Sequence, residues 1–395
     1  MKKPLIVQKF GGTSVGSIER IQNVAEQVIQ AKLAGNRLVV VVSAMSGETN
    51  RLVELAKQID SVPNAREFDV LLSTGEQVSM ALLAMALSKL GHHSVSLTGH
   101  QAQIQTNNQH NHATISDINP QVIQRYLDDD LIVIVAGFQG VNALGDITTL
   151  GRGGSDTTAV TLAGALSADE CQIYTDVAGV YTADPRIVVN ARCLEKIDFT
   201  TMEVMSKKGA KVLHLPCVTY AGENDVPLRV LSSFESGPGT LVKGRDPEPG
   251  ISGVALQKRL LAISMPLHQK PRIDQQIKLC GIEIDCQIMD GSDYTLIAQP
   301  DAIHRAISML SDTVIEETQV GLVTVVGEIT ASLISQSQQL LNLAEISVLH
   351  FCEDKHSFTL VIDSEAIDKA ANVLHDNYII TNITVSREEK LAYLG

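Results

Sequence analysis

The stretch Asp146-Ile-Thr-Thr-Leu-Gly-Arg-Gly-Gly-Ser-Asp-Thr-Thr-Ala159 holds three glycines within four positions, together with Arg152 and several hydroxyl side chains. Val160, Ala163 and Leu166 then follow with helical spacing, so a loop that opens a helix is predicted. Glycines let the backbone approach a ligand, and a helix N-terminus offers unpaired N–H groups at the positive end of a dipole. The stretch fits an anion-binding loop, but an ordinary strand-to-helix turn is the better explanation when it is taken alone.

Strands and helices alternate on both sides of this loop. The expected strands are residues 5–7, 38–42, 95–97, 131–136 and 170–175, and the expected helices are residues 18–35, 52–59, 73–90 and 157–166. Ser73 and Glu76 have the spacing of a capping box at the start of the third helix. Residues 43–50 are expected to form a loop, and the polar region 99–119 a lobe over the sheet edge. The alternation predicts an α/β fold with a mainly parallel central sheet and right-handed crossovers.

The C-terminal part of the chain contains an internal repeat. Residues 235–250 are rich in proline and glycine, which indicates a linker. Beyond it, residues 282–312 align with residues 346–376 without a gap. Each copy is expected to form a ferredoxin-like βαββαβ unit, which suggests regulation or assembly. The predicted domains are residues 1–245, 251–320 and 321–395, with a strand near 252–257 that can pair with the last domain.

Composition limits the possible functions. The chain has 395 residues, of which 44% are hydrophobic and 19% charged, which is typical of a globular protein. A net charge of −14 and an aromatic content of 4% argue against nucleic acid or an anionic membrane as partners. The start of the chain lacks the pattern of a signal peptide, and we expect a cytoplasmic protein. The six cysteines lack metal-site spacing, so we expect them to be reduced and mostly buried.

Three loops after apolar strands could line one crevice, because the carboxyl ends of parallel strands share an edge of the sheet. They are residues 9–14, 151–156 and 175–186. The common nucleotide fingerprints do not fit. Gly16 is followed by Ser17 where a Walker-A loop needs Lys, and Asp156 stands where a dinucleotide loop has Gly or Ala. A different nucleotide-binding fold is therefore needed.

Several side chains near these loops could act on phosphate or on an amino acid. Lys9 and Lys211 could reach phosphate oxygens, Asp176 could orient cations, and Arg152 has the planar fork that grips a carboxylate. Each of these side chains also has a simpler explanation as surface charge or as part of a turn. Glu76 could bind an amino group, but its place in the capping box explains it equally well. His110 and His112 look like part of a solvated loop, and no metal site is expected there.

Taken together, the motifs Lys9-Phe-Gly-Gly-Thr-Ser, Thr148-Thr-Leu-Gly-Arg-Gly-Gly-Ser-Asp156, Thr175-Asp-Val-Ala-Gly-Val-Tyr-Thr-Ala-Asp-Pro-Arg186 and Gly209-Ala-Lys-Val-Leu-His214 resemble the aspartate kinase family. The resemblance implies the amino-acid-kinase fold, a three-layer sandwich with a mainly parallel sheet, followed by paired ACT units of the βαββαβ type. It implies transfer of a phosphoryl group from MgATP to the side-chain carboxylate of L-aspartate, the first step towards lysine, threonine and methionine.

The resemblance also assigns residues. The implied catalytic residues are Lys9, Asp176 and Lys211. The implied ATP residues are Lys9, Phe10, Gly11, Gly12, Thr175, Asp176, Tyr181, Thr182, Ala183, Asp184, Pro185, Arg186, Lys211 and Val212. The implied aspartate residues are Ser43, Gly47, Glu48, Thr49, Asn50, Arg51, Glu76, Arg152, Gly153, Gly154 and Ser155. Mg²⁺ is expected to be held mainly through ATP phosphates, and no protein metal site is implied.

Two other readings stay open from the sequence. The first is a related amino-acid kinase, such as acetylglutamate or uridylate kinase, which lacks the paired C-terminal ACT units, called the tail below. The second is an amino-acid sensor that binds nucleotide without turnover. In the tail, the segment Leu267-His-Gln-Lys-Pro271 lacks the glycine of the family's Asp-x-Pro-Gly effector loop. We therefore expect the tail to pair chains into a homodimer or higher oligomer and to bind effectors weakly or differently.

Overall fold

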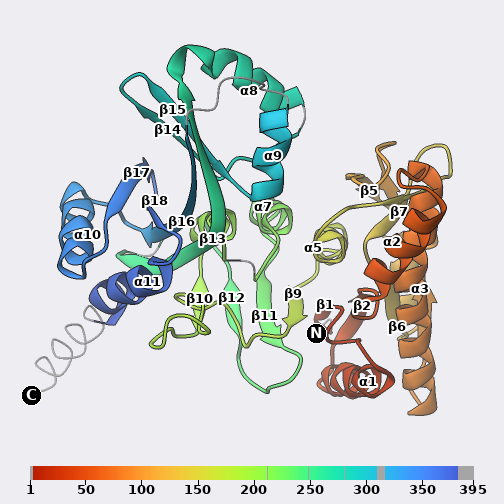
Figure 1. The fold of residues 1–395 in the computed structure, drawn as a ribbon. Helices are drawn as coiled ribbons and strands as arrows, with labels where there is room; N and C mark the ends of the chain where they lie inside the picture. Colours follow the sequence, from red (N-terminus) through yellow and green to blue (C-terminus); the bar gives the residue numbers. More distant parts are fainter. Residues whose placement is uncertain (1–2, 211, 248, 280, 309–315, 381–395) are drawn as a thin grey trace, which may run out of the picture. The chain divides into compact units, whose positions relative to one another are not determined.

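A computed structural model describes residues 3–210, 212–247, 249–279, 281–308 and 316–380 (Figure 1). The contacts within the chain divide it into two compact units. The first unit contains residues 1–180, 193–203 and 211–246, and the second contains residues 181–192, 204–210 and 247–395. Each unit is described by itself below.

The first unit is built on an eight-stranded sheet in the order β10-β12-β11-β9-β1-β2-β6-β3. Its strands are β1 (Leu5–Phe10), β2 (Arg37–Val42), β3 (Ser94–Leu97), β6 (Ile132–Ala136), β9 (Glu170–Thr175), β10 (Lys196–Ile197), β11 (Leu228–Ser232) and β12 (Thr240–Val242). The six strands from β11 to β3 run parallel, and β12 is antiparallel to β11. The expected mainly parallel sheet is confirmed.

Helices pack on both faces of this sheet. The helices of this unit are α1 (Ile18–Leu33), α2 (Glu48–Ile59), α3 (Ala65–Lys89), α4 (Gln121–Asp128), α5 (Gly154–Ala165), α6 (Phe199–Lys207), which ends in the second unit, and α7 (Leu215–Glu223). Of these, α1, α3, α4 and α5 contact strands of the sheet, whereas α2 packs on α3 and α7 packs on α5. Strand β2 explains the layering, because all six of its residues are buried. Leu38, Val40 and Val42 pack in one core with α1 and α3, and the alternate residues point to the opposite face, where α5 lies. The result is a three-layer sandwich.

The long helix α3 begins earlier than the sequence suggested. Its N-cap is Asn64, whose side chain accepts hydrogen bonds from the backbone N–H groups of Arg66 and Glu67. Ser73 and Glu76 lie inside the helix, and Ser73 donates its hydroxyl to the carbonyl of Val70. The expected capping box is therefore wrong. Glu76 needs another explanation, which the site below provides.

Replacing Asn64 by alanine is expected to lower the free energy of unfolding by about 1 kcal/mol, because two N–H groups at the helix start lose their acceptor. Chemical denaturation of the full chain measures this loss. Thr74→Ala is the matched control, since Thr74 is exposed in the interior of the same helix and alanine has the higher helix propensity. An equal loss in both variants would contradict the role of Asn64 as the cap.

Three further expectations need correction. Helix α2 begins at Glu48, so residues 48–50 are helical rather than part of a loop. The polar region 99–119 contains β4 (Ile104–Thr106) and β5 (Ile115–Ile118), which join β7 (Gln139–Val141) and β8 (Ile147–Thr149) in a four-stranded sheet. Strand β12 lies inside the expected linker, where it pairs with β11 on one side and with β10 on the other.

Helix α3 is long and apolar enough to cross a membrane by length and composition alone. In this structure it is a core helix, which runs beside β2 and β6 and contacts α1 and α2 (Figure 1). Its Met80, Leu83 and Leu87 belong to the buried core of the first unit. The same helix also carries the buried carboxyl groups of Asp69 and Glu76. Burial in the protein explains its apolar composition.

The second unit contains an antiparallel six-stranded sheet in the order β14-β15-β13-β16-β18-β17. Its strands are β13 (Ile251–Pro266), β14 (Cys286–Asp290), β15 (Asp293–Ala298), β16 (Glu316–Gly327), β17 (Val348–Asp354) and β18 (Ser357–Asp363). Its helices are α8 (Lys270–Leu279), α9 (Pro300–Ser308), α10 (Ala331–Leu343) and α11 (Ile367–His375), with the short turns η1 (Leu267–Gln269) and η2 (Asp376–Ile380).

The repeat read from the sequence appears as a repeat of elements. Strand β13 is followed by α8, β14, β15 and α9, and β16 is followed by α10, β17, β18 and α11. Strands β13 and β16 pair along most of their length, with a register shift between Gln257 and Leu260. The early part of β13, from Gly253 to Gln257, pairs with Val326 to Leu322 of β16. Residue 320 lies inside β16, and residues 309–312 of the first copy and 381–395 of the last domain lie outside the described residues.

Candidate active site

The carboxyl ends of four parallel strands carry the candidate residues of the first unit. Strand β1 leads into Gly11 and Gly12, β2 into Ser43, β6 into Gly137 and β9 into Asp176. Backbone hydrogen bonds tie these ends together, from Ser43 N–H to the carbonyl of Phe10 and from Gly137 N–H to that of Val42. The edge of a parallel sheet where the strands end is the usual ligand site of such folds.

Lys9 lies near the end of β1 and forms an ion pair with Asp156. Its Nζ atom is 2.7 Å from Asp156 Oδ1, and the two side chains are only 10% and 14% exposed. Asp156 lies in the first turn of α5, directly after the loop of residues 151–154, which is called the glycine loop below. No role was predicted for Asp156 from the sequence. Its position in the first turn of a predicted helix, just after the glycines, could have indicated a role at the site. The structure thus makes Asp156, and not Asp176, the described partner of Lys9.

A cleft of about 270 Å³ lies beside this pair. Eight of the eleven predicted aspartate residues line it, namely Ser43, Gly47, Thr49, Glu76, Arg152, Gly153, Gly154 and Ser155. Gly12, which was assigned to ATP, lines the same cleft, as do the unassigned Ala44, Met45, Ser46, Phe138 and Gly151. The structure therefore brings together residues from the ends of β1 and β2, helix α3 and the glycine loop.

Glu76 presents a buried carboxylate to this cleft. One oxygen, Oε1, accepts the backbone N–H of Ala44 at 3.0 Å, and the residue is 4% exposed. The other oxygen, Oε2, is buried and has no hydrogen-bond partner among the described residues. Burial raises the pKa of Glu76 from 4.5 to about 7, while the hydrogen bond from Ala44 acts in the opposite direction. An unpaired buried carboxylate is costly, so this group is suited to receive a cation from a ligand.

Arg152 is exposed at the mouth of the same cleft, within the glycine loop. No ion pair of Arg152 is found in the part of the chain that the structure describes. Gly153, the N-cap of α5, has φ of 70°, and a Cβ atom there would overlap the ring of His214. A glycine is thus required to place the loop against His214. Ser155 approaches Ser43 with an Oγ–Oγ distance of 2.7 Å, which ties α5 to the end of β2.

Three predicted aspartate residues do not line the cleft. Glu48 and Arg51 pair with each other on the surface of α2, with a distance of 2.7 Å between Oε1 and Nη2. Their hydrogen bonds lower the pKa of Glu48. Asn50 lies exposed on the same helix. Thr49 belongs to the same helix and lines the cleft, so α2 presents one face to the cleft, and these three residues lie on its other faces.

The predicted ATP residues of the first unit differ in their surroundings. The side chain of Phe10 is fully buried and stacks on Tyr174, so it belongs to the core. Thr175 donates its hydroxyl to Asp176, which is exposed at the end of β9. Val212 is half-buried in the turn before α7. Lys211 lies outside the described residues.

The predicted ATP residues 181–186 belong to the second unit. Thr182 is buried there, and its hydroxyl lies 2.8 Å from Nε2 of His375 at the end of α11. Its carbonyl accepts the N–H of Val254 in β13, and Ala183 packs in the core of this unit. Asp184 and Arg186 form a two-pronged ion pair, which lowers the pKa of Asp184. The nucleotide assignment of Tyr181, Thr182, Ala183, Asp184, Pro185 and Arg186 stays a prediction.

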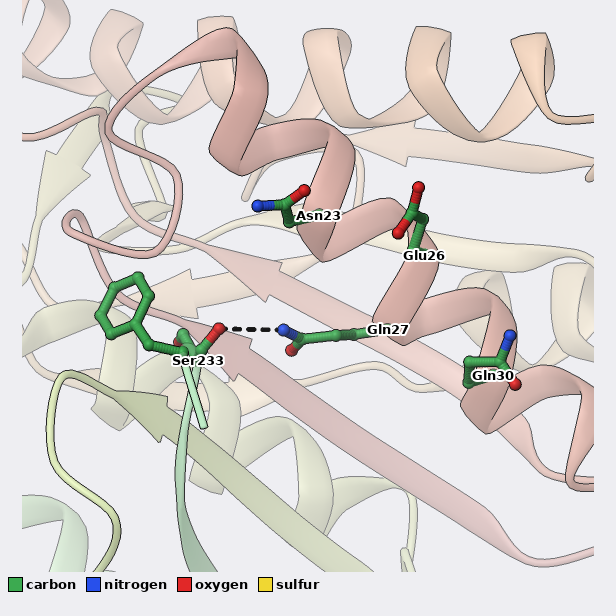
Figure 2. A pocket seen from close by; sticks show the side chains of 6 residues that line it. Asn23, Glu26, Gln27, Gln30 and Ser233 are labelled. Carbon is green, nitrogen blue, oxygen red and sulfur yellow. Dashed lines mark hydrogen bonds between the residues drawn. The ribbon is translucent and has the colours of Figure 1, made fainter. Parts of the chain in front are cut away.

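A second cavity of the first unit, of about 410 Å³, is lined by α1 and the end of β11. Figure 2 shows its polar lining, in which Gln27 donates its side-chain N–H to the carbonyl of Ser233 at 3.0 Å. None of the residues predicted for ATP or aspartate lines this cavity. Its lining consists of amide, hydroxyl and carboxylate groups and the half-exposed Phe234, without a lysine or arginine. The smaller cleft around Glu76 is therefore the better candidate for anion chemistry.

His110, in the loop of residues 107–112, has structural contacts. His110 Nδ1 lies 2.6 Å from Oδ2 of the fully buried Asp69, which also accepts the N–H of Asn111 and the hydroxyl of Thr149. This cluster fastens the loop to α3 and β8. No group of three or more His, Cys, Asp or Glu placed to hold a metal ion occurs among the described residues.

The chain is similar to known proteins along most of its length. Residues 4–232 match the model of the amino acid kinase family. The chain is 46% identical over 396 residues to an aspartate kinase of Pseudomonas putida, covering 94% of this chain and 96% of that protein. It is 40% identical over 420 residues to an aspartokinase of Corynebacterium glutamicum, covering 99% of each chain.

Solved structures show the same fold. The crystal structure of Escherichia coli aspartokinase III in complex with aspartate and ADP matches with a TM-score of 0.79 at 24% identity, covering 94% of this chain and 99% of that one. The aspartate kinase of Synechocystis matches with a TM-score of 0.56 at 34% identity, covering 94% of this chain and 69% of that one.

Proposed function

The chain belongs to the amino acid kinase family and, within it, to the aspartate kinases, and we propose that the cleft around Glu76 and Arg152 binds L-aspartate beside the ATP phosphates. The chain is an ATP-dependent kinase that transfers the γ-phosphoryl group to the side-chain carboxylate of L-aspartate. The product is 4-phospho-L-aspartate. This reaction is the first step in the biosynthesis of lysine, threonine and methionine.

The free carboxylate oxygen of Glu76 is the observation that carries the proposed aspartate site. The α-ammonium group of aspartate would supply the missing partner of Oε2 and would keep Glu76 ionised at neutral pH. Arg152, at the mouth of the cleft, would grip the α-carboxylate with its planar fork. These two contacts would leave the side-chain carboxylate of aspartate to face the phosphate site.

The phosphate site is proposed around Lys9, Gly11, Gly12 and the N-terminus of α5. An aspartate carboxylate is already ionised at pH 7, so the nucleophile needs no general base. Catalysis then depends on holding two anions in line and on neutralising charge on the transferred group. Lys9 supplies that positive charge, and Asp156 would hold its ammonium group in place at 2.7 Å. Lys211 and Asp176 stay proposed catalytic residues.

Mg²⁺ is proposed to enter with ATP and to be held mainly through the phosphate oxygens. Asp176, exposed at the end of β9, offers carboxylate oxygens, the ligand type that Mg²⁺ prefers. When bound, the ion would supply further neutralisation of phosphate charge. We also propose a cytoplasmic location for the enzyme.

Replacing Asp156 by asparagine is expected to lower kcat about 10- to 100-fold, because Lys9 loses the charge that orients it towards the phosphate. Steady-state kinetics with varied ATP and aspartate measure this change. Asp117→Asn, on the exposed face of β5, is the matched control and is expected to leave kcat unchanged. An unchanged kcat in Asp156→Asn would contradict the positioning role of Asp156.

The proposed function is tested by trapping the product. The purified chain is incubated with MgATP, L-aspartate and hydroxylamine, and aspartyl hydroxamate is measured together with ADP. Equal amounts of both products are expected, because hydroxylamine captures an acyl phosphate. N-acetyl-L-glutamate and uridine monophosphate serve as control acceptors for the related kinases. ADP without hydroxamate, or turnover only with a control acceptor, would overturn the assignment, and bound ATP without turnover would indicate a sensor.

The tail is proposed to assemble the chain into a homodimer or higher oligomer. The edge strand β17 exposes Leu349 and Phe351, which are 47% and 50% exposed, and among the described residues its ladder pairing is with β18. We propose that effector binding by this tail is weak or altered, since residues 267–271 lack the family's glycine. Inhibition by lysine or threonine at sub-millimolar concentration would contradict the effector part of this proposal.

A further inference from the structure

Two thiols meet at the edges of the sheet in the second unit. Cys286 begins β14 and Cys352 lies in β17, and these are the two edge strands of the six-stranded sheet. The strands nevertheless contact each other, and the two Sγ atoms are 2.8 Å apart. The cysteines are 66 residues apart in the chain, so tertiary structure alone brings them together.

The surroundings of the two sulfurs differ. Cys286 is 9% exposed and packs in an apolar cluster with Ile288 and Ile297, whereas Cys352 is half-buried at the margin of that cluster. Cys352 points to the opposite face of β17 from the exposed Phe351. A small reagent can therefore reach Cys352 more easily than Cys286.

A cation lies close to Cys352. Lys208 pairs with Asp354, which lies two residues after Cys352, at 2.7 Å, and its side chain is only 11% exposed. The hydrogen bond from the Cys286 thiol lowers the pKa of Cys352, and the charge of Lys208 lowers it further, against desolvation and the charge of Asp354. The pKa of Cys286 is raised by its interaction with Cys352 and by burial. The more accessible sulfur is thus also the one favoured as thiolate, the reactive form of cysteine.

We propose that Cys286 and Cys352 are a modification site that forms a reversible intramolecular disulfide on reaction with a low-molecular-weight disulfide. The Cys352 thiolate attacks one sulfur of the reagent, a mixed disulfide forms, and one reagent thiolate leaves. Cys286 then gives up its proton, and its sulfur attacks the Cys352 sulfur. This step forms the bond between the two cysteines and releases the second reagent thiolate. The two protons of the protein thiols pass to the two leaving thiolates, and the reagent is reduced as the protein is oxidised.

The consequence of the bond is a covalent link between the two edge strands of the tail. It would join the β14-β15-β13 half of the sheet to the β16-β18-β17 half and close a loop of 66 residues. Closing a long loop restricts the unfolded chain more than the folded one. The oxidised form is therefore expected to have a Tm about 5 °C or more above that of the reduced form. Disulfides are rare in reducing compartments, and those that form there are usually transient, as a reversible bond between these two cysteines would be.

The test uses the full chain and oxidised glutathione as the probe. After incubation, free thiols are alkylated and the digest is analysed by mass spectrometry under non-reducing conditions. The expected product is a Cys286–Cys352 peptide pair within one chain, which dithiothreitol reverses. Glutathione adducts alone, unmodified thiols at both positions, or a disulfide with the exposed Cys193 would overturn the proposal. Because this readout uses the wild-type chain, it does not depend on the folding of a variant.

Single substitutions distinguish the cysteine that attacks the reagent from the cysteine that resolves the mixed disulfide. In Cys286→Ser the mixed disulfide at Cys352 is expected to accumulate, whereas in Cys352→Ser Cys286 is expected to stay unmodified. Lys208→Met is expected to slow oxidation about 3- to 10-fold, because the thiolate loses a nearby cation. Lys207→Met is the matched control, since Lys207 is the exposed neighbour and is expected to leave the rate unchanged. Equal reactivity of both single cysteines, or equal rates in both lysine variants, would contradict the assigned order of attack.

Discussion

Lys9→Ala is expected to lower kcat at least about 10³-fold, the largest effect of any single substitution proposed for this enzyme. Removing one preorganised group that stabilises transition-state charge typically costs two to three orders of magnitude, and a cation on a transferred phosphoryl group can contribute more. Lys9 is the buried cation at the end of β1, beside Gly11 and Gly12. Steady-state kinetics with the hydroxamate readout measure the loss.

Stability must be separated from catalysis in this variant, because Lys9→Ala leaves the Asp156 carboxylate without its partner in a nearly buried position. The double variant Lys9→Ala/Asp156→Asn is expected to recover the lost stability while staying inactive. Lys57→Ala, at an exposed position of α2, is the matched control and is expected to keep both activity and Tm. A single variant that folds and turns over at the wild-type rate would exclude the proposed role of Lys9.

Glu76→Gln is expected to raise the KM for aspartate about 30- to 100-fold with a smaller change in kcat. Glutamine keeps the size of the side chain and an acceptor for Ala44 N–H, but it cannot offer a negative charge to the α-ammonium group. The loss corresponds to about 2–3 kcal/mol, the usual range for a hydrogen bond to a charged group in a buried site. Aspartate titrations at fixed MgATP measure it.

The pH dependence of the same group gives a second readout. Because the pKa of Glu76 in the folded enzyme is about 7, the wild-type KM for aspartate is expected to rise as pH falls below 7, where the carboxyl group becomes protonated. Glu76→Gln is expected to show no such rise. Glu54→Gln, an exposed position of α2, should retain the wild-type profile. A wild-type KM that is constant from pH 5.5 to about 8 would contradict the assignment of Glu76 as the ammonium partner.

Lowering the pH is expected to weaken aspartate binding but to increase the stability of the fold. The folded-state pKa of Glu76 lies above its ordinary value of 4.5, so the folded chain holds a proton that the unfolded chain releases between pH 4.5 and about 7. The free energy of unfolding is therefore reduced as pH rises through this window, by about 3 kcal/mol in total. Glu76→Gln removes this cost, so the variant is expected to be more stable than the wild type at pH 8 and equally stable near pH 4. Denaturant titrations at the two pH values measure the difference.

The sequence predicted most of the central sheet, because strands buried on both faces are apolar at every position. Residues 38–42 of β2 are the clearest example, and the glycine loop before α5 was recognised for a similar local reason. The start of α3 was placed wrongly because Ser73 and Glu76 have capping-box spacing, while the true cap, Asn64, precedes a polar first turn. Local patterns of this kind cannot show which of two possible caps the chain uses.

By itself, the sequence determined the fold class, the repeated tail and the loops that carry the chemistry, because these depend on periodicity, glycine spacing and motifs along the chain. Only the tertiary structure decided which side chains meet. In the folded chain Lys9 lies beside Asp156, and Glu76 is buried with one carboxylate oxygen unpaired among the described residues. Glu48 and Arg51 pair with each other outside the cleft. Thr182 also contacts His375, and Cys286 contacts Cys352. Residues distant in the chain leave no local pattern, and burial, which changes their pKa values and reactivity, arises only when the elements pack together.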